Sequence, residues 1–232
     1  MRTEDLSTVR ALPLFADMEE GHFQELMQAA YLQRFPPQVQ LITEGEPADF
    51  LHVVVEGAAE LFASANSRET SIAIVSPVAT FILAAVLNDA VYLMSARSLE
   101  PSRILMIPSE NIRAMLALDA AFARSIVREL AVRYRTVVKA LKNQKLRTGA
   151  ERLANYLLRE HAAQGGSGML TLPVEKRTLA SLLGMTPENL SRAFGALRGY
   201  GVAVNGPEIA LTKPDELAGL ARPTPLIDDE EP

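Results

Sequence analysis

The clearest hydrophobic pattern in the chain lies between Lys176 and Tyr200. Two short segments there carry apolar residues at helical spacing, namely Leu179, Leu182 and Leu183, then Leu190, Phe194 and Leu197. Gly184 stands between the segments, where a tight corner needs a residue without a side chain. Thr186 and Pro187 are typical of a helix start, as N-cap and first helical residue. The pattern predicts two helices joined at a corner.

The opposite face of the second predicted helix is polar. It carries Glu188, Asn189, Ser191 and Arg192. Residues three and four apart share a helix face, and these residue types can bond to base edges: arginine to guanine, a carboxylate to cytosine, serine to either. A solvated face with a helical Glu–Arg pair would look the same. The spacing of Ala180, Gly184 and Leu190, which is that of a helix-turn-helix, favours DNA binding. We predict these DNA-binding residues: Lys176, Arg177, Thr178, Thr186, Glu188, Asn189, Ser191 and Arg192.

Between Val39 and Ile107 the pattern changes to short β-rich runs separated by turn residues. The predicted strands are Leu41–Ile42, Phe50–Val55, Ala59–Phe62, Ile72–Val75, Tyr92–Ala96 and Arg103–Ile107. The predicted turns are Glu44-Gly45-Glu46-Pro47, Glu56-Gly57 and Ala65-Asn66-Ser67. Many short strands at this spacing indicate a β-roll or barrel, and the apolar run Phe81–Leu87 predicts a short helix within it. Residues 5–33 read as helical.

A long helix is predicted from about Ser109 to Asn143. Its apolar stripe has spacings of 4, 4, 3 and 4 residues and comprises Ile126, Leu130, Tyr134, Val137 and Leu141. Burial against the roll would explain such a stripe, but the charges around it favour a two-helix contact between subunits. We therefore predict a homodimer.

After this helix, Gly149–Ala163 reads as a further helix and Met169–Leu172 as a strand. Val202–Val204 and Glu208–Leu211 flank Asn205-Gly206-Pro207, whose Asn-Gly pair predicts a hairpin that would form a wing. The Pro-rich and acidic residues 222–232 predict a disordered acidic tail.

Charge and composition narrow the class of protein. The 232-residue chain has a net charge of −5, but residues 103–159 hold 12 Lys and Arg against 4 Asp and Glu, whereas residues 1–60 hold 3 against 11. The basic excess thus precedes the predicted helix-turn-helix, where it could contact phosphates. The absence of cysteine excludes disulfides, thiolate metal sites and cysteine-held iron–sulfur clusters. We see no signal segment and no membrane span, so a cytoplasmic protein without membrane contact is expected.

Taken together, the E-G-E-P turn, the V-V-E-G turn, the long helix and the winged helix-turn-helix resemble the superfamily of the cyclic-AMP receptor protein and the fumarate–nitrate regulator (Crp/Fnr). Two stretches also resemble FtrB-type activators of ferrous-iron transport: LQRFPPQVQLITEGEPADFLHVVVEG and KRTLASLLGMTPENLSRAFG. The resemblance covers roughly residues 10–215. It implies an α+β fold with a cyclic-nucleotide-binding-like β-roll, a long central dimerisation helix and a C-terminal winged helix-turn-helix. The corresponding boundaries are 1–108, 109–146 and 147–221, followed by the tail 222–232.

The resemblance also suggests what the second helix reads. In the fumarate–nitrate branch the pattern E-x-x-S-R reads a TTGAT half-site, and Glu188, Ser191 and Arg192 match it. The cyclic-AMP branch has R-E-x-x-x-R instead, and Pro187 stands where its first arginine would be. The resemblance therefore implies a TTGAT-like palindromic site.

The roll departs from the cyclic-nucleotide pattern at its phosphate and ribose contacts. Ile82-Leu83 follow Phe81 where Gly-Glu is needed, and Tyr92-Leu93 stand where an Arg with Ser or Thr is needed. An unpaired phosphate in such apolar surroundings would cost several kcal/mol. We therefore predict no cyclic-nucleotide binding. The space is either filled core or an effector pocket for an apolar or planar ligand, lined by Phe81, Ile82, Leu83, Tyr92, Leu93 and Met94.

His52 lies in the β-rich run FLHVVVEG and could be an axial haem ligand, since some relatives bind haem; a core histidine is the alternative. No metal site, nucleophile elbow or phosphate loop stands out, so we expect no enzyme and predict no cofactor. The leading interpretation is a homodimeric transcription regulator that binds double-stranded DNA and RNA polymerase, with an unknown small-molecule effector. A haem-based sensor with the same output, or a cyclic-nucleotide module acting on a partner protein, are the alternatives.

Overall fold

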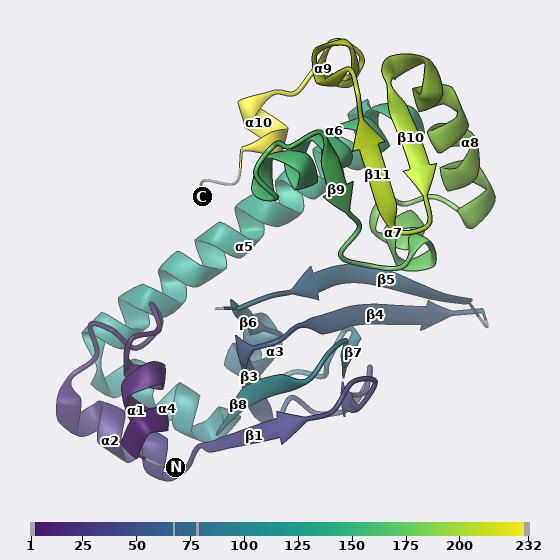
Figure 1. Ribbon diagram of the computed structural model, residues 1–232. Coiled ribbons are helices and arrows are strands. Elements are labelled where there is room, and N and C mark those ends of the chain that lie inside the picture. Colours follow the sequence, from purple (N-terminus) through teal and green to yellow (C-terminus); the bar gives the residue numbers. More distant parts are fainter. Residues whose placement is uncertain (1–2, 67, 78, 230–232) are drawn as a thin grey trace. The chain divides into compact units, whose positions relative to one another are not determined.

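The computed structural model of the chain describes residues 3–66, 68–77 and 79–229. The chain divides into two compact units, one ending at Arg133 and one beginning at Tyr134 (Figure 1). We describe each unit separately. The predicted dimerisation segment, residues 109–146, is shared between the units.

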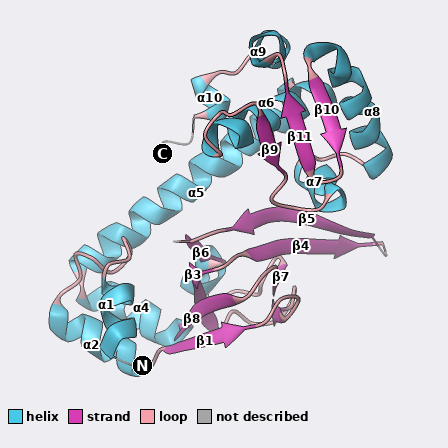
Figure 2. Cartoon of the chain, viewed as in Figure 1, coloured by secondary structure: helices cyan, strands magenta, loops and turns pink. Residues whose placement is uncertain are grey.

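The first unit is a β-roll made of two antiparallel four-stranded sheets, with strand orders β1-β8-β3-β6 and β2-β7-β4-β5 (Figure 2). The strands are β1 (Tyr31–Phe35), β2 (Gln40–Ile42), β3 (Phe50–Glu56), β4 (Ala59–Ala65), β5 (Arg68–Val75), β6 (Ala79–Phe81), β7 (Ser95–Ser98) and β8 (Ser102–Pro108). The helices of this unit are α1 (Thr3–Arg10), α2 (Glu20–Gln28), α3 (Leu83–Asn88), α4 (Ser109–Leu118) and the first part of α5 (Ala120–Leu146). One apolar core joins the sheets to the helices.

Steric fit explains the turn between β3 and β4, and aromatic packing explains how the helices are joined. Gly57 links β3 to β4 with φ +82°, and a Cβ there would lie 2.6 Å from the carbonyl oxygen of Pro101. Only glycine fits such a position without displacing backbone. The ring of Phe15 packs against that of Phe23 on α2 and that of Phe122 on α5, with centroids 6.1 Å apart in both pairs, and this buried apolar contact joins the two helices.

Several predicted elements of the roll differ in the structure. Residues 31–33, predicted as the end of a helix, belong to β1, because the backbone of Tyr31–Phe35 pairs with β8 from Met106 to Ser102. Phe81 ends strand β6 and the helix starts at Leu83. The predicted strand Tyr92–Ala96 begins only at Ser95, since Tyr92 lies in a loop whose backbone bonds the turn at Gly45. Of the predicted turn at residues 65–67, Ser67 lies outside the described residues.

The predicted single long helix is two helices. Asp119 interrupts it with an extended backbone and accepts hydrogen bonds at 2.8 Å from the backbone N–H groups of Phe122 and Glu19. This side chain therefore caps the start of α5 and also holds the segment before α2. The helix α5 then continues to Leu146, slightly beyond the predicted end.

The second unit carries helices α6 (Gly149–Ala163), α7 (Lys176–Leu182), α8 (Pro187–Leu197), α9 (Pro214–Ala221) and α10 (Pro225–Asp228), with a short 3-10 turn η1 (Arg198–Tyr200). Its antiparallel sheet has the order β10-β11-β9 and consists of β9 (Met169–Thr171), β10 (Val202–Asn205) and β11 (Glu208–Leu211). The predicted hairpin turn at Asn205-Gly206 is present, with Gly206 at φ +60°.

The prediction of a disordered tail is wrong for the residues that the structure describes. Residues 225–228 form α10, and the carboxylate of Asp228 pairs with the guanidinium of Arg147 at 2.5 Å. The sequence pattern missed this because the partner lies 81 residues away. Residues 230–232 of the predicted tail lie outside the described residues.

Candidate nucleic-acid interface

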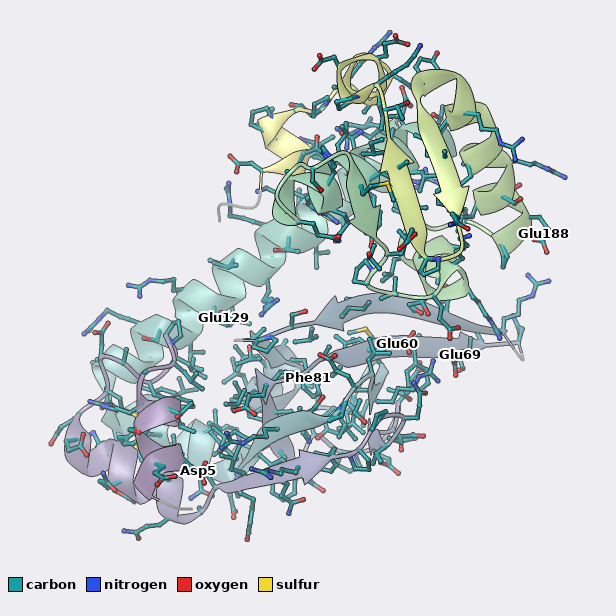
Figure 3. All side chains as sticks on the ribbon, viewed as in Figure 1. Asp5, Glu60, Glu69, Phe81, Glu129 and Glu188 are labelled. Atoms are coloured by element: carbon teal, nitrogen blue, oxygen red, sulfur yellow. The ribbon has the colours of Figure 1, made fainter. Side chains whose placement is uncertain are left out.

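Helix α8 has one buried and one exposed face. Its buried residues are Leu190, Ala193, Phe194 and Leu197, which join the core of the second unit. The exposed residues include all four predicted on the polar face: Glu188, Asn189, Ser191 and Arg192. Figure 3 shows Glu188 on the outward side of α8. The helix therefore presents a row of hydrogen-bonding side chains that the fold itself leaves accessible.

The first turn of α8 is held by its own side chains. The hydroxyl of Thr186 caps the helix by accepting from the backbone N–H of Asn189 at 3.3 Å. A hydrogen bond with the Thr186 side chain lowers the pKa of Glu188, and the charge of Arg192 adds to this effect. Glu188 is thus ionised at neutral pH and can accept a hydrogen bond. Arg192 reaches the side-chain oxygen of Asn189 at 3.5 Å, so its guanidinium lies beside the same turn.

Helix α7 carries the other predicted contacts. Lys176 and Arg177 are exposed at its first turn, and Thr178 is half-buried. The ammonium of Lys176 lies 5.9 Å from the ring of Phe194, at the outer limit of a cation–π contact. Lys176 and Arg177 are therefore exposed cations at the start of the helix that precedes α8.

The corner between α7 and α8 is supported by the end of α5. Gly184 has φ +61°, and a Cβ there would collide with the side-chain amide of Gln144. Arg152 donates from Nε to the carbonyl of Leu183 at 2.8 Å and from Nη1 to the carbonyl of Arg147 at 2.7 Å. Burial lowers the pKa of Arg152. The sequence analysis missed Gln144 and Arg152, because nothing in their local pattern indicates partners in the corner.

The apolar stripe on α5 differs from the predicted one at its first member. Ile126 is 2% exposed and packs in the core of its own subunit, so it cannot form an exposed seam. Val127, which the sequence analysis missed, is 66% exposed. Replacing Ile126 by Val127 changes the spacings to 3, 4, 3 and 4 residues, which is a regular heptad pattern. We call the following set the α5 stripe: Val127, Leu130, Tyr134, Val137 and Leu141.

The members of the α5 stripe differ in the exposed fraction of their side chains. Tyr134, Val137 and Leu141 are between 55% and 72% exposed. Leu130 is half-buried and packs partly against the core of the first unit. The stripe is therefore exposed at Val127 and again beyond residue 133, with the half-buried Leu130 between these two parts.

The residues predicted to line an effector pocket differ in how far they are exposed to solvent. Phe81, Leu83 and Tyr92 are at most 4% exposed and belong to the packed core, while Ile82 and Met94 are half-buried against it. Leu93 is 76% exposed, so its placement in a pocket lining is wrong. Tyr92 is turned inward and donates its hydroxyl to the carbonyl of Phe50 at 3.3 Å.

His52 lies between two strands rather than in an open site. It is 2% exposed and its ring stacks on Phe81 with centroids 5.1 Å apart. Burial lowers its pKa to about 4, so the imidazole is neutral. Its Nδ1 atom has no hydrogen-bond partner among the described residues. A neutral imidazole with an unpaired nitrogen has the chemistry of a ligand, but a haem would have to displace the ring of Phe81.

Comparisons with known proteins bear on both units. Residues 32–119 match the family described as Cyclic nucleotide-binding domain, and residues 151–220 match the Crp-like helix-turn-helix domain. The chain belongs to the Crp/Fnr family. It is 23% identical over 216 residues to the CRP-like cAMP-activated global transcriptional regulator of Mycobacterium tuberculosis, covering 90% of this chain and 96% of that one.

This Crp/Fnr regulator is also 23% identical over 186 residues to the transcriptional activator protein Anr of Pseudomonas protegens, covering 78% of this chain and 76% of that one. A solved structure described as a transcriptional regulator of the Crp/Fnr family from Eubacterium rectale matches the fold with a TM-score of 0.75 at 18% identity, covering 91% of this chain and 99% of that one. The chain is therefore a DNA-binding transcription regulator with a sensor domain, and not an enzyme.

The sensor of this Crp/Fnr regulator contains a charged network that the sequence analysis did not identify. Glu60 on β4 is 2% exposed and accepts from Nε of Arg97 at 2.7 Å. The same guanidinium reaches Glu69 on β5 at 2.9 Å and lies 4.4 Å from the ring centre of Phe62. A buried carboxylate needs such partners, so the network explains how Glu60 is tolerated in the sheet.

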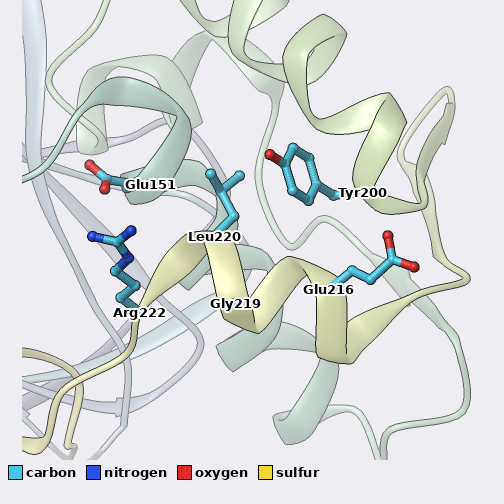
Figure 4. A pocket seen from close by; sticks show the side chains of 6 residues that line it. All are labelled: Glu151, Tyr200, Glu216, Gly219, Leu220 and Arg222. Atoms are coloured by element: carbon cyan, nitrogen blue, oxygen red, sulfur yellow. The ribbon is translucent and has the colours of Figure 1, made fainter.

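A hollow of about 390 Å³ lies on the second unit of this Crp/Fnr regulator (Figure 4). It is lined by Glu151, Tyr200, Glu216, Gly219, Leu220 and Arg222. Its carboxylates already have partners: Glu151 forms a capping box with Thr148, and Glu216 pairs with Lys213 at 3.1 Å. We assign no ligand to the hollow.

Two further observations concern ligands and membranes. Among residues 3–66, 68–77 and 79–229, no group of three His, Cys, Asp or Glu is arranged to hold a metal ion. Within the same described part of this Crp/Fnr regulator, none of the helices has the length and apolar character needed to cross a bilayer.

Proposed function

We propose that this regulator binds as a homodimer to a palindromic, TTGAT-like site, which it reads with α8. The exposed row Glu188, Ser191 and Arg192 carries the proposal, because the fold buries the other face of the helix and leaves these base-reading groups free. Lys176 and Arg177 would hold phosphates beside it. The relatives named as transcriptional regulators support the same output.

The α5 stripe supports the dimer. Its heptad spacing and the exposure of Tyr134, Val137 and Leu141 are those of a parallel two-helix seam. A two-fold axis along such a seam would present two recognition helices about 34 Å apart, one helical turn of DNA. The site should then consist of two inverted half-sites. RNA polymerase would be the further partner of such a regulator.

Selection of bound fragments from random DNA with the purified full chain tests this proposal. We expect enrichment of inverted half-sites whose centres are about 10 bp apart. Enrichment of an unpaired site, or of no sequence at all, would show that the dimeric base-reading proposal is wrong.

We propose further that the sensor does not respond to cyclic nucleotides, although a relative is named as cAMP-activated. Leu83 and Tyr92, which replace the phosphate and ribose contacts, are buried in the core and offer no charge to a cyclic phosphate. Calorimetric titration with cyclic AMP and cyclic GMP should give no saturable heat. Micromolar binding of either nucleotide would contradict this part of the proposal.

Haem is the competing sensor ligand, and His52 is the residue that would bind it. The unpaired Nδ1 atom favours this candidate, while the stacking on Phe81 opposes it. Absorption spectra during a haem titration of the wild type and of His52→Ala separate the two. A Soret shift that requires His52 would establish haem, and identical spectra would leave His52 as a core residue.

A further inference from the structure

The C-terminal segment, residues 222–229, connects two parts of the second unit that are distant in sequence. It leaves α9 at Arg222, which adopts a left-handed backbone at φ +47°. Just before it, the carbonyl of Ala221 accepts a hydrogen bond at 2.7 Å from the buried amide of Asn155 on α6. The segment therefore starts from a fixed point on the DNA-binding domain.

The far end of the segment is bound to α5 and the residue that follows it. Asp228 accepts two parallel hydrogen bonds from Arg147, at 2.6 and 2.5 Å, and the side chain of Arg147 is only 7% exposed. The carboxylate of Asp228 also accepts a hydrogen bond at 2.7 Å from the backbone N–H of Thr224, which fixes the carboxylate within α10. Partial burial would raise the pKa of Asp228, but these hydrogen bonds lower it. A bidentate pair of this kind specifies geometry as well as charge.

Two lysines extend the contact along α5. Lys142 donates to the carbonyl of Leu226 at 3.1 Å, and Lys139 donates to the carbonyl of Asp229 at 2.6 Å. At about 100° per residue, Lys139 lies on the side of α5 opposite to the α5 stripe, and Lys142 lies about a quarter turn away from the stripe. The segment can therefore stay in place while the stripe contacts a second subunit.

The joint between α5 and α6 is thus held from two directions. On one side, Gln144 packs against Gly184 at the corner of the helix-turn-helix, and Arg152 bonds the carbonyls of Leu183 and Arg147. On the other side, residues 222–229 bind Lys142 of α5 and Arg147. The joint itself is short, since α5 ends at Leu146 and α6 begins at Gly149. Without these contacts, rotation about a few backbone bonds would change the angle between the stripe and α8.

We propose that residues 222–229 form a strap that fixes this angle, with the Asp228–Arg147 pair as its lock. This inference rests on the proposed dimeric function. Tyr134, Val137 and Leu141 of the stripe belong to the same compact unit as the recognition helix, so the angle between them lies within that unit. In a dimer, the angle sets the separation of the two α8 helices. The strap holds the separation that DNA requires, so binding does not have to order the joint.

The absence of cysteine in the chain makes a direct test simple. A single Ala196→Cys substitution on the exposed face of α8 places one spin label in each subunit, and the label-to-label distance in the DNA-free dimer reports the separation of the helices. We compare this protein with versions carrying Asp228→Asn or ending at Ala221. The control is Asp215→Asn, which removes the same charge from the first turn of α9, outside the strap.

We expect Asp228→Asn and the truncation to broaden or shift the distance distribution. In unlabelled protein they should weaken binding to the selected DNA site by roughly 2- to 30-fold, and Asp215→Asn should change neither. Unchanged distances and affinity in both strap variants would overturn the strap. Tighter DNA binding would overturn it too, since the strap would then hold an unsuitable angle.

Failure of the strap and failure of the proposed function are distinguishable. If only the strap is wrong, the labelled Ala196→Cys protein still gives an inter-subunit distance and the unlabelled wild type binds its site. An Ala196→Cys protein without that distance, or a wild type without sequence-specific binding, would overturn the dimeric function and with it the role assigned to the strap.

Discussion

At the scale of single residues, the interface depends on which side chains the fold leaves exposed and what fixes them. Thr186 is both the cap of α8 and the neighbour whose hydrogen bond lowers the pKa of Glu188. Arg192 lies within reach of Asn189 at 3.5 Å, a contact weak enough to be exchanged for a base. The first turn of α8 is therefore ordered before DNA arrives, while its arginine stays free to move.

We expect Arg192→Ala to lose sequence preference at one position of each half-site. The loss should be ~1–3 kcal/mol for the preferred base, because a bidentate contact to guanine disappears. Lys176→Ala is the matched control, since it should weaken all sequences alike and reduce the salt dependence. Binding assays on the selected site and its point variants measure both. If Arg192→Ala kept the ratios between variants, the base-reading role would be wrong.

His22 predicts a pH dependence at the start of α5. A hydrogen bond to Asp119, at 3.1 Å, raises the pKa of His22, and the charges of Glu19, Asp119 and Glu25 act in the same direction. A raised pKa means stability that is present below about pH 6.5 and is lost as the pH rises through the folded-state value. The wild type should therefore exceed His22→Gln in stability more at about pH 5.5 than at about pH 8.5.

Thermal unfolding of both proteins across this range measures the effect. Asp119 contributes the opposite pH dependence, and only in strong acid. Burial alone would raise the pKa of Asp119, but hydrogen bonds from backbone N–H groups lower this pKa to about 2. Its own contribution is thus present above about pH 4 and is lost as the pH falls toward 2. A stability difference between wild type and His22→Gln that did not vary with pH would show that His22 contributes no charge-dependent stability.

At the scale of elements, strands and helices are placed by a few obligatory positions. The turn between β3 and β4 depends on Gly57, and the break between α4 and α5 depends on Asp119. The paired backbone of β8 likewise decides that residues 31–35 become a strand. Each of these is a contact with a distant segment that fixes local structure.

We expect Gly57→Ala to destabilise the sensor by more than ~2 kcal/mol. The new Cβ would collide with the side chain of Ser102 and the backbone of Pro101, in addition to the cost of a left-handed alanine. Gly45→Ala is the matched control: it has φ +87° but nothing within 4 Å of the added atom, so it should cost only ~1 kcal/mol. Equal shifts of the unfolding midpoint would contradict the steric argument.

At the scale of the whole molecule, the α5 stripe decides whether two copies can act together. Val137→Glu is the sharpest test, because the side chain is 64% exposed and its replacement leaves the subunit core intact. Leu130 is a poorer choice, since it also packs against the first unit. We expect Val137→Glu to produce monomers by light scattering and to lose specific DNA binding.

Ala140→Glu is the control for this prediction. Ala140 is exposed on the same helix but lies off the stripe, so the added charge should leave the dimer intact. A Val137→Glu protein that remained dimeric would reject the α5 stripe as the seam. Loss of the dimer in both variants would point to helix destabilisation rather than to the seam.

The sequence by itself determined the elements whose signals are local. The spacing of apolar residues gave α7, α8 and α6, and the Asn-Gly pair gave the wing between β10 and β11. The polar row on α8 was also readable, because helical periodicity alone separates it from the buried face. Family membership followed from the order of these local patterns.

Only the tertiary structure decided the features that depend on distant partners. Ile126 and Val127 are adjacent apolar residues, and packing alone decides that the first is core and the second exposed. Leu93 looks like its buried neighbour Tyr92 in the sequence, yet it points to solvent. The acidic tail reads as disordered until Arg147 supplies its partner. In each case the deciding free energy comes from a contact across the fold, which no local pattern contains.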